Sequence, residues 1–133
     1  MKLHHIGFWT KDIEKQIAFY QKYFDGQVLF RHQSGDFCSA FVRICGSVNL
    51  ELMTRSALNE RVPEERVGYS HFSIEVDSKE EVDRLTDLFI ADNVTLEKNK
   101  EQYDDGFYES AVIDPDGNLV EIAFVDHNVN SAV

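Results

Sequence analysis

Residues 69–76 alternate between polar and apolar side chains in the order YSHFSIEV. Because successive side chains of a strand point to opposite faces, this stretch predicts a strand with one apolar face and with His71 on the other face. Ser78 follows with Glu81 three positions later, which is the pattern of a capping box at the start of a helix. We therefore expect a strand that leads directly into a helix.

The beginning of the chain has the same pattern. Residues 3–9 (LHHIGFW) predict a strand with His5 on one face and with Ile6 and Phe8 on the other. Asp12, a favoured N-cap residue, then precedes a stretch of helical periodicity, at the same spacing after the histidine as in the later stretch. The chain thus contains an internal repeat, which is a strong indication of its architecture.

The repeat extends to a second strand in each half. Residues 48–53 and 118–123 are apolar stretches that each contain one glutamate, Glu51 and Glu121. Glu51 follows His5 by 46 residues, and Glu121 follows His71 by 50 residues. Each half of the chain therefore supplies one histidine and one glutamate in the same order.

Apolar periodicity and turn residues predict the order βαβββ in both halves. The expected helices are 12–24 and 79–92, and the further expected strands are 27–32, 37–45, 48–53, 94–98, 108–113 and 118–125. Gly26 is expected to take the left-handed conformation after the first helix, Gly46 and Ser47 to form a tight hairpin, and 99–106 to be a polar loop.

The predicted fold class is α+β. We expect a single domain, residues 1–133, in which two βαβββ modules form a curved cup of mixed sheet. The modules are expected at about 1–55 and 69–125, joined by the charged segment 56–68.

Composition narrows the possible functions. The chain has 133 residues, 43% of them hydrophobic, and a net charge of −11. This acidic balance argues against nucleic acid as a partner, because phosphates require a basic surface. No apolar stretch is long enough to span a membrane, and no basic start precedes an apolar signal core. We expect a cytoplasmic protein with a small-molecule substrate.

The two histidines and two glutamates define the candidate site. One interpretation is that His5, Glu51, His71 and Glu121 are ordinary polar residues on the solvent face of a sheet that helices cover on its other side. However, Trp9 and Tyr69 fall on the same predicted faces and suit a cup better than a solvated surface. In an enclosed cup, two carboxylates would require a neutralising cation. Two imidazoles and two carboxylates suit Zn, Ni, Co, Mn or Fe(II).

Residues 3–124 resemble the vicinal oxygen chelate superfamily, which is built of paired βαβββ modules and includes glyoxalases, bleomycin resistance proteins and extradiol dioxygenases. Within it, the chain is most similar to small bacterial glyoxalase I, also called lactoylglutathione lyase. The resemblance rests on His5, on Glu51 in NLEL, on His71 in YSHFSI and on Glu121 after DPDGN. These four positions match the four metal ligands of that family, which implies Zn or Ni first, with Co, Mn or Fe as other candidates.

The resemblance also implies an activity. It points to a metal-dependent lyase or isomerase that acts on a hydroxy-carbonyl substrate through a metal-bound enediolate, with Glu121 as the catalytic proton carrier. It further implies a homodimer, since relatives often complete each site with residues of two chains.

The chain departs from glyoxalase I at two positions. Trp9 occupies a position that is arginine in that family, and Arg55 occupies one that is asparagine; both family residues hold glutathione. Glyoxalase-type chemistry is therefore expected without a clear glutathione site, and Trp9, Arg55 and Tyr69 are the candidate substrate-binding residues. Tyr108 is a further candidate for a pocket wall.

Two other functions remain open. A metal-free binding protein of the bleomycin-resistance type would hold a small molecule or antibiotic between aromatic walls, for which Trp9 and Tyr69 are suited. An Fe(II) extradiol-type dioxygenase would use two histidines and one carboxylate, so Glu51 as a fourth ligand argues against it.

Overall fold

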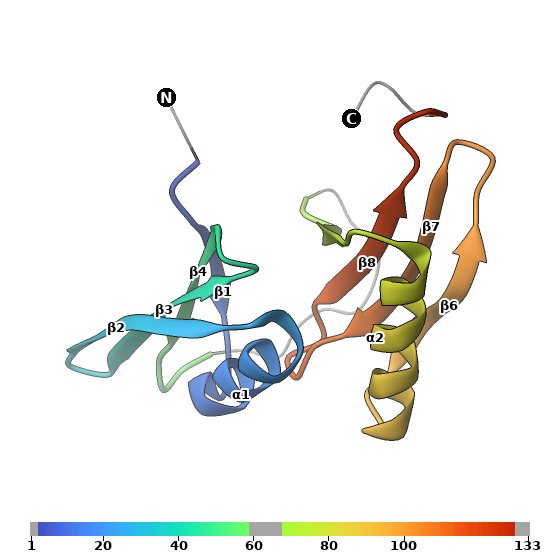
Figure 1. Cartoon of the computed structure of the whole chain (residues 1–133). Coiled ribbons are helices and arrows are strands. Elements are labelled where there is room, and N and C mark those ends of the chain that lie inside the picture. Colours follow the sequence, from blue (N-terminus) through green and yellow to red (C-terminus); the bar gives the residue numbers. More distant parts are fainter. Residues whose placement is uncertain (1–2, 59–67, 130–133) are drawn as a thin grey trace. The chain divides into compact units, whose positions relative to one another are not determined.

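The computed structural model describes residues 3–58 and 68–129, and the chain divides into two compact units, residues 1–62 and 63–133. Within the described residues, each unit contains one helix and one four-stranded sheet (Figure 1). The elements of the first unit are β1 (Ile6–Trp9), α1 (Ile13–Phe24), β2 (Gln27–Ser34), β3 (Phe37–Ile44) and β4 (Val48–Thr54). Those of the second are β5 (His71–Glu75), α2 (Lys79–Ala91), β6 (Leu96–Gln102), β7 (Phe107–Ile113) and β8 (Leu119–Val125).

The predicted α+β class and the repeated βαβββ order are confirmed. The segment predicted to join the modules, 56–68, lies mostly outside the described residues. Among the residues that are described, neither helix is long and apolar enough to cross a membrane.

Both sheets have the same mixed topology. The strand order is β1-β4-β3-β2 in the first unit and β5-β8-β7-β6 in the second, and both sheets are open with two edge strands. In each sheet the first and last strands of the unit pair in parallel, and the remaining pairs are antiparallel. The strand that begins at or just after the predicted histidine of each unit is therefore the direct neighbour of the strand that carries the predicted glutamate.

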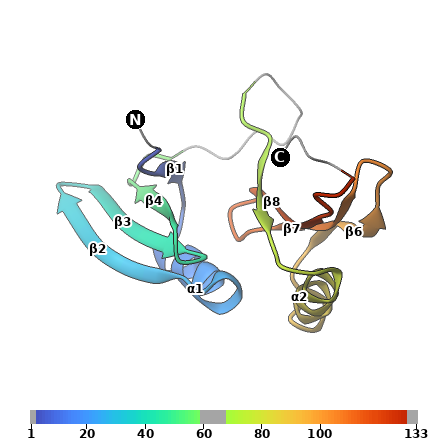
Figure 2. The same cartoon turned by 45° about the horizontal axis from the view of Figure 1, so that its top comes forward.

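One helix covers one face of each sheet, as Figure 2 shows for α1 and α2. In the first unit, Tyr20 and Phe24 of α1 are buried together with Leu50 and Leu52 of β4. In the second unit, Val82 and Phe89 of α2 are buried together with Val120 and Ile122 of β8. The alternation of side chains then places the polar residues of each central strand on the face away from the helix.

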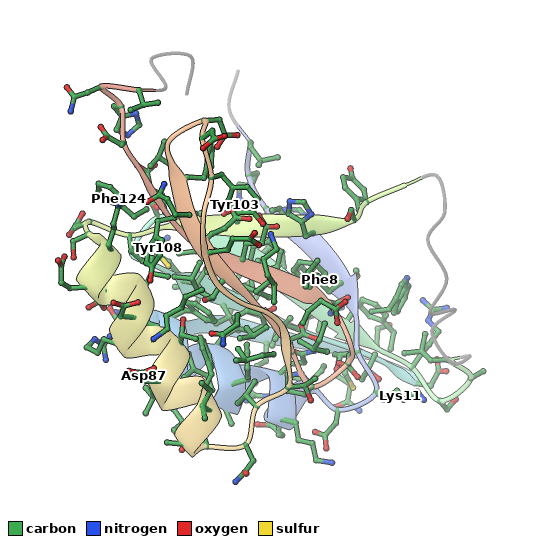
Figure 3. The ribbon with its side chains drawn as sticks, turned by 90° about the vertical axis from the view of Figure 1, so that its right-hand side faces the viewer. Phe8, Lys11, Asp87, Tyr103, Tyr108 and Phe124 are labelled. Atoms are coloured by element: carbon green, nitrogen blue, oxygen red, sulfur yellow. The ribbon has the colours of Figure 1, made fainter. Side chains whose placement is uncertain are left out.

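Side-chain hydrogen bonds fix α2 on its sheet. Tyr108 of β7 donates to Asp83 of α2 at 2.7 Å, and Figure 3 shows Tyr108 beside this helix. Tyr108 therefore lies on the helix-covered face, and its prediction as a wall of a substrate pocket is wrong. The alternation of strand side chains is the reason, since Tyr108 shares a face with the buried Ser110 and Val112.

The helix starts follow the predicted caps. The Asp12 carboxylate accepts hydrogen bonds from the amides of Glu14 and Lys15, both at 3.1 Å. The Ser78 hydroxyl accepts one from the amide of Glu81 at 3.2 Å. The second half of the predicted capping box does not form, because the Glu81 carboxylate instead binds the guanidinium of Arg84 one turn later.

Two turns differ from prediction by one residue. After α1 the left-handed residue is Asp25, with φ of 51°, and not Gly26. Gly26 is required for another reason: a Cβ there would lie 2.7 Å from the backbone carbon of Tyr20. In the β3–β4 hairpin, Cys45 and Gly46 both have positive φ, as a type I′ turn requires, so the turn begins one residue earlier than Gly46 and Ser47 predicted.

The polar segment expected as a loop at 99–106 is partly strand. β6 continues to Gln102 because its backbone pairs with β7, with Glu101 opposite Glu109 and Gln102 opposite Tyr108. An edge strand tolerates polar side chains on its exposed positions, so the absence of an apolar pattern did not prevent strand formation here.

Candidate functional site

The first unit brings His5 and Glu51 together. Strands β1 and β4 pair in parallel with Gly7 opposite Glu51, so His5, which lies just before β1, is on the same face as that glutamate. The His5 Nε2 atom lies 3.2 Å from the Glu51 Oε2 atom. Both side chains are half-buried, with the ring of Phe41 edge-on to His5 at 5.1 Å between centroids.

The second unit repeats this arrangement with His71 and Glu121. Strands β5 and β8 are parallel, with Ser73 opposite Glu121, and His71 lies two residues before Ser73 on the same face. The His71 Nε2 atom lies 3.3 Å from the Glu121 Oε2 atom. The side chain of Glu121 is only 15% exposed, so this carboxylate is the more enclosed of the two glutamates.

The other ring nitrogen of each histidine is held by the residue immediately before it. His5 Nδ1 lies 2.8 Å from His4 Nδ1, and His71 Nδ1 lies 3.2 Å from the Ser70 hydroxyl. A partner on Nδ1 fixes the ring and directs Nε2 toward the glutamate, as outer partners do for metal-binding histidines. Sequence analysis identified neither role; the repeat of a polar residue before each histidine was the available signal.

Side-chain hydrogen bonds help to position the strands that carry the glutamates. Before β8, the buried Asp114 carboxylate accepts hydrogen bonds from the amides of Asp116 and Asn118 and from the Asn118 side chain, at 2.8–3.0 Å. At β4, Asn49 donates to the carbonyl of His4 at 3.2 Å. These contacts hold the start of each strand in place and so help to fix the positions of Glu51 and Glu121.

Glu121 is the glutamate of the candidate site whose pKa is raised by its surroundings. Burial raises the pKa of Glu121, the negative charge of Glu109 raises it further, and His71 and Lys98 lower it. A carboxyl group whose pKa moves toward neutrality is better suited to accept and return a proton near physiological pH. Lys98 and Glu109 lie on the same sheet and were not identified from sequence, because their relation to Glu121 depends on the pairing register of three strands.

The donor sets fit a divalent cation. Two donor atoms that each lie about 2.1 Å from one ion are about 3.0 Å apart in octahedral cis positions and about 3.4 Å apart at a tetrahedral angle. The observed 3.2 and 3.3 Å fall in this interval and exceed the roughly 2.7–2.9 Å of a direct charged hydrogen bond. Within the described part of either unit, no three His, Cys, Asp or Glu side chains converge on a point, so each unit supplies two donors.

The candidate substrate-binding residues differ in their surroundings. Arg55 stacks on two aromatic rings, with its guanidinium carbon 5.0 Å from the centroid of Trp9 and 5.5 Å from that of Phe37. Trp9 is 48% exposed and lies on the same face of β1 as His5. Tyr69 is fully exposed just before β5, so the structure does not bring it into contact with the His71–Glu121 pair.

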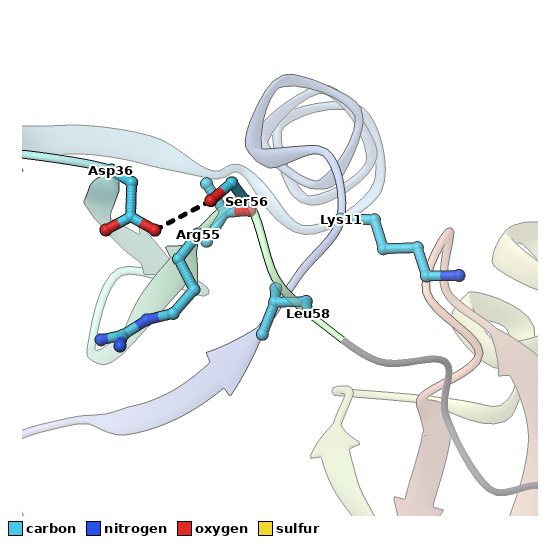
Figure 4. A pocket seen from close by; sticks show the side chains of 6 residues that line it. Lys11, Asp36, Arg55, Ser56 and Leu58 are labelled. Atoms are coloured by element: carbon cyan, nitrogen blue, oxygen red, sulfur yellow. Dashed lines mark hydrogen bonds between the residues drawn. The ribbon is translucent and has the colours of Figure 1, made fainter.

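A surface depression of about 420 Å³ lies beside Arg55 in the first unit. Its lining includes Lys11, Asp36 and Ser56, and the Ser56 hydroxyl donates to the Asp36 carboxylate at 3.0 Å (Figure 4). The Lys11 and Arg55 side chains point away from each other in this view. The depression is therefore not a cradle formed by two converging cations.

Comparison with known proteins agrees with this architecture. A structure from Frankia sp. described as a glyoxylase/bleomycin resistance protein/dioxygenase domain is 18% identical, with a TM-score of 0.83 and coverage of 95% of this chain and 98% of that one. A lactoylglutathione lyase from Agrobacterium tumefaciens is 26% identical, with a TM-score of 0.68 and 92% coverage of both chains. A mutant fosfomycin resistance protein FosX from Listeria monocytogenes, in complex with Mn(II) and dihydroxypropylphosphonic acid, is 23% identical, with a TM-score of 0.76 and coverage of 96% and 95%.

The family assignment follows from the sequence match. The family model of the Glyoxalase/Bleomycin resistance protein/Dioxygenase superfamily matches residues 2–122, which include both His–Glu pairs and nearly all described elements. The chain belongs to the Glyoxalase/Bleomycin resistance protein/Dioxygenase superfamily.

Proposed function

We propose that this protein is a divalent-metal-dependent, glyoxalase-like enzyme that isomerises a small hydroxy-carbonyl substrate. The observation that carries the proposal is the repeated His–Glu pair, with donor distances of 3.2 and 3.3 Å that suit one cation. Two comparisons support the reaction class. The chain belongs to a superfamily that includes glyoxalases, and it is 26% identical to a lactoylglutathione lyase.

In this proposal His5, Glu51, His71 and Glu121 together hold one ion, either within one chain or across two copies. Zn or Ni is the first choice, and Co, Mn or Fe are alternatives compatible with imidazole and carboxylate donors. A related structure with Mn(II) supports a divalent ion. When bound, the ion would act as a Lewis acid that polarises the substrate carbonyl and makes the adjacent C–H more acidic.

Glu121 is the proposed proton carrier. It would take the proton from the carbon that bears the hydroxyl group and return it to the adjacent carbonyl carbon, while the hydroxyl proton passes to the former carbonyl oxygen. The reaction is then a net isomerisation without an external oxidant or reductant. Burial raises the pKa of Glu121, which favours the abstraction step, because a carboxylate with a higher pKa is a stronger base.

His71→Ala is expected to reduce bound metal from about one ion per chain to a small fraction of that. The variant removes one of the imidazole donors and leaves Glu121 without its partner at 3.3 Å. Bound metal is measured by elemental analysis after equilibration with one divalent ion and removal of the excess.

His127→Ala is the matched control. His127 also pairs with a glutamate of the second unit, Glu75, at 2.9 Å, but it is not a proposed ligand. Full metal content in His71→Ala, or equal losses in both variants, would contradict the proposed ligand set.

Turnover of the glutathione adduct of methylglyoxal is expected to be at least about tenfold lower in kcat/KM than turnover of the adduct of a small neutral thiol. Trp9 offers one N–H donor where a carboxylate of glutathione would need a charged fork, a difference of roughly 1.5–3 kcal/mol. Arg55 is held against Trp9 and Phe37, which restricts its reach. Both adducts are assayed with the same metal-loaded preparation, and efficient use of the glutathione adduct would contradict this prediction.

A metal-free binding protein remains the second candidate. The observation that favours it is the aromatic surface of the first unit, where the rings of Phe30 and Phe41 stack at 4.5 Å and Trp9 is exposed. The His–Glu pairs have no role in that function, so metal binding by the wild type distinguishes the two proposals. A dioxygenase is less well supported, because Glu51 would add a fourth ligand to a three-ligand site.

A further inference from the structure

Two charged residues of the second sheet share a face with Glu121, one on the adjacent strand β7 and one on β6, the next strand beyond it. The register places Lys98 of β6 opposite Ala111 of β7, and Ala111 opposite Glu121 of β8, so these three residues form one row on one face of the sheet. Glu109 lies two residues from Ala111 on β7, on the same face and diagonal to Glu121. The small side chain of Ala111 leaves no bulky group between Lys98 and Glu121.

Lys98 and Glu109 form an ion pair at one side of this row. The Lys98 Nζ atom lies 2.7 Å from the Glu109 Oε1 atom, and the ammonium group also lies 4.8 Å from the centroid of the Tyr103 ring. The Glu109 side chain is only 11% exposed, whereas that of Lys98 is 33% exposed. Water therefore screens the carboxylate poorly, and its charge acts on neighbouring groups unless Lys98 compensates it.

We propose that Lys98 and Glu109 act in opposite directions on the cation affinity of the His71–Glu121 half of the site, and that their effects largely cancel while both charges are present. This inference rests on the proposed metal function and goes beyond it, because neither residue is a ligand. Both residues act through their charge on the nearby donors. Lys98 lowers the affinity of these donors for a cation, and Glu109 raises it.

The pair predicts opposite effects for its two members. Lys98→Gln keeps a hydrogen-bond donor for Glu109 but leaves the carboxylate uncompensated, so a divalent ion should bind roughly tenfold more tightly. Glu109→Gln leaves the Lys98 charge uncompensated, so the ion should bind roughly tenfold more weakly. The double variant removes both charges and should return to within about threefold of the wild type.

The experiment is a calorimetric titration of apo protein with Mn²⁺ alone, at about pH 8, where carboxyl groups with ordinary pKa values are ionised. Wild type, both single variants and the double variant are compared at ionic strengths of about 0.05 and about 0.5 M, and the two shifts should shrink at the higher value. Lys100→Gln is the matched control, because Lys100 lies on the same strand but pairs with Asp87 of α2 at 3.0 Å. This control should bind Mn²⁺ like the wild type.

Opposite shifts that cancel in the double variant would support the inference. If the wild type binds Mn²⁺ but both single variants bind it more weakly, this inference is overturned and the proposed function is not. Loss of packing would weaken binding in both variants, whereas the inference requires opposite shifts. Absence of Mn²⁺ binding by the wild type would overturn both this inference and the proposed function. If Glu109→Gln does not fold, as judged by circular dichroism, Lys98→Gln decides the matter, because structural damage does not tighten binding.

Discussion

Glu121→Gln is expected to lower kcat by roughly 10³-fold while the protein still binds metal. The amide oxygen of glutamine can remain near His71 and donate electrons to a cation, but the amide group cannot accept and return a proton, a function worth roughly 10²–10⁴-fold in rate. The enclosed position of Glu121, 15% exposed and 3.3 Å from His71, makes it the better placed of the two glutamates for this role.

Two measurements separate proton transfer from metal binding. Bound metal and steady-state rates are determined on the same preparation, with the hydroxy-carbonyl substrate that the wild type uses best. Glu75→Gln is the control, since Glu75 lies on the same face of the second sheet, opposite Ala123, and pairs with His127 rather than with His71. Full activity in metal-loaded Glu121→Gln would exclude Glu121 as the proton carrier and would direct attention to Glu51.

The fold could be predicted from sequence because each element has a local cause. The alternation in residues 69–76 places Phe72 and Ile74 toward the helix, and the N-caps Asp12 and Ser78 begin the two helices as expected. The duplication then supplied the topology, because the same order of elements in both halves predicts the same sheet twice. The strand pairing was not predicted; it is the parallel pairing of β1 with β4 and of β5 with β8 that brings the histidine and glutamate of each unit to one face.

Features that depend on tertiary pairing could not be predicted. β6 extends to Gln102 because its backbone pairs with that of β7, and the pattern of side chains in residues 99–102 does not indicate this pairing. The Lys98–Glu109 pair and its relation to Glu121 arise from a register in which a bulge shifts the pairing of β6 between Lys98 and Glu101. The contact of His4 with His5 was likewise missed, because alternation alone predicts that adjacent residues of a strand face opposite sides.

A mixture of His5→Ala and His71→Ala chains is expected to recover about one quarter of wild-type activity, although each variant alone is inactive. We propose a homodimer in which each site combines His5 and Glu51 of one chain with His71 and Glu121 of the other. Random pairing then gives hybrids in half of the dimers, and each hybrid has one intact site and one doubly defective site. The two variants are coexpressed with different tags, and the activity of doubly purified hybrids should be about half that of the wild type.

The control mixture combines His5→Ala with Glu51→Ala. Both defects lie in the first unit, where the two side chains are 3.2 Å apart, so every site of every hybrid contains a damaged pair and no activity should return. If hybrids of the first mixture form but remain inactive, or if light scattering shows a monomer, the four ligands must come from a single chain. Because each unit contains a complete His–Glu pair at a spacing suited to a cation, the ligand set itself is compatible with either arrangement, and the recovery of activity in hybrids decides between them.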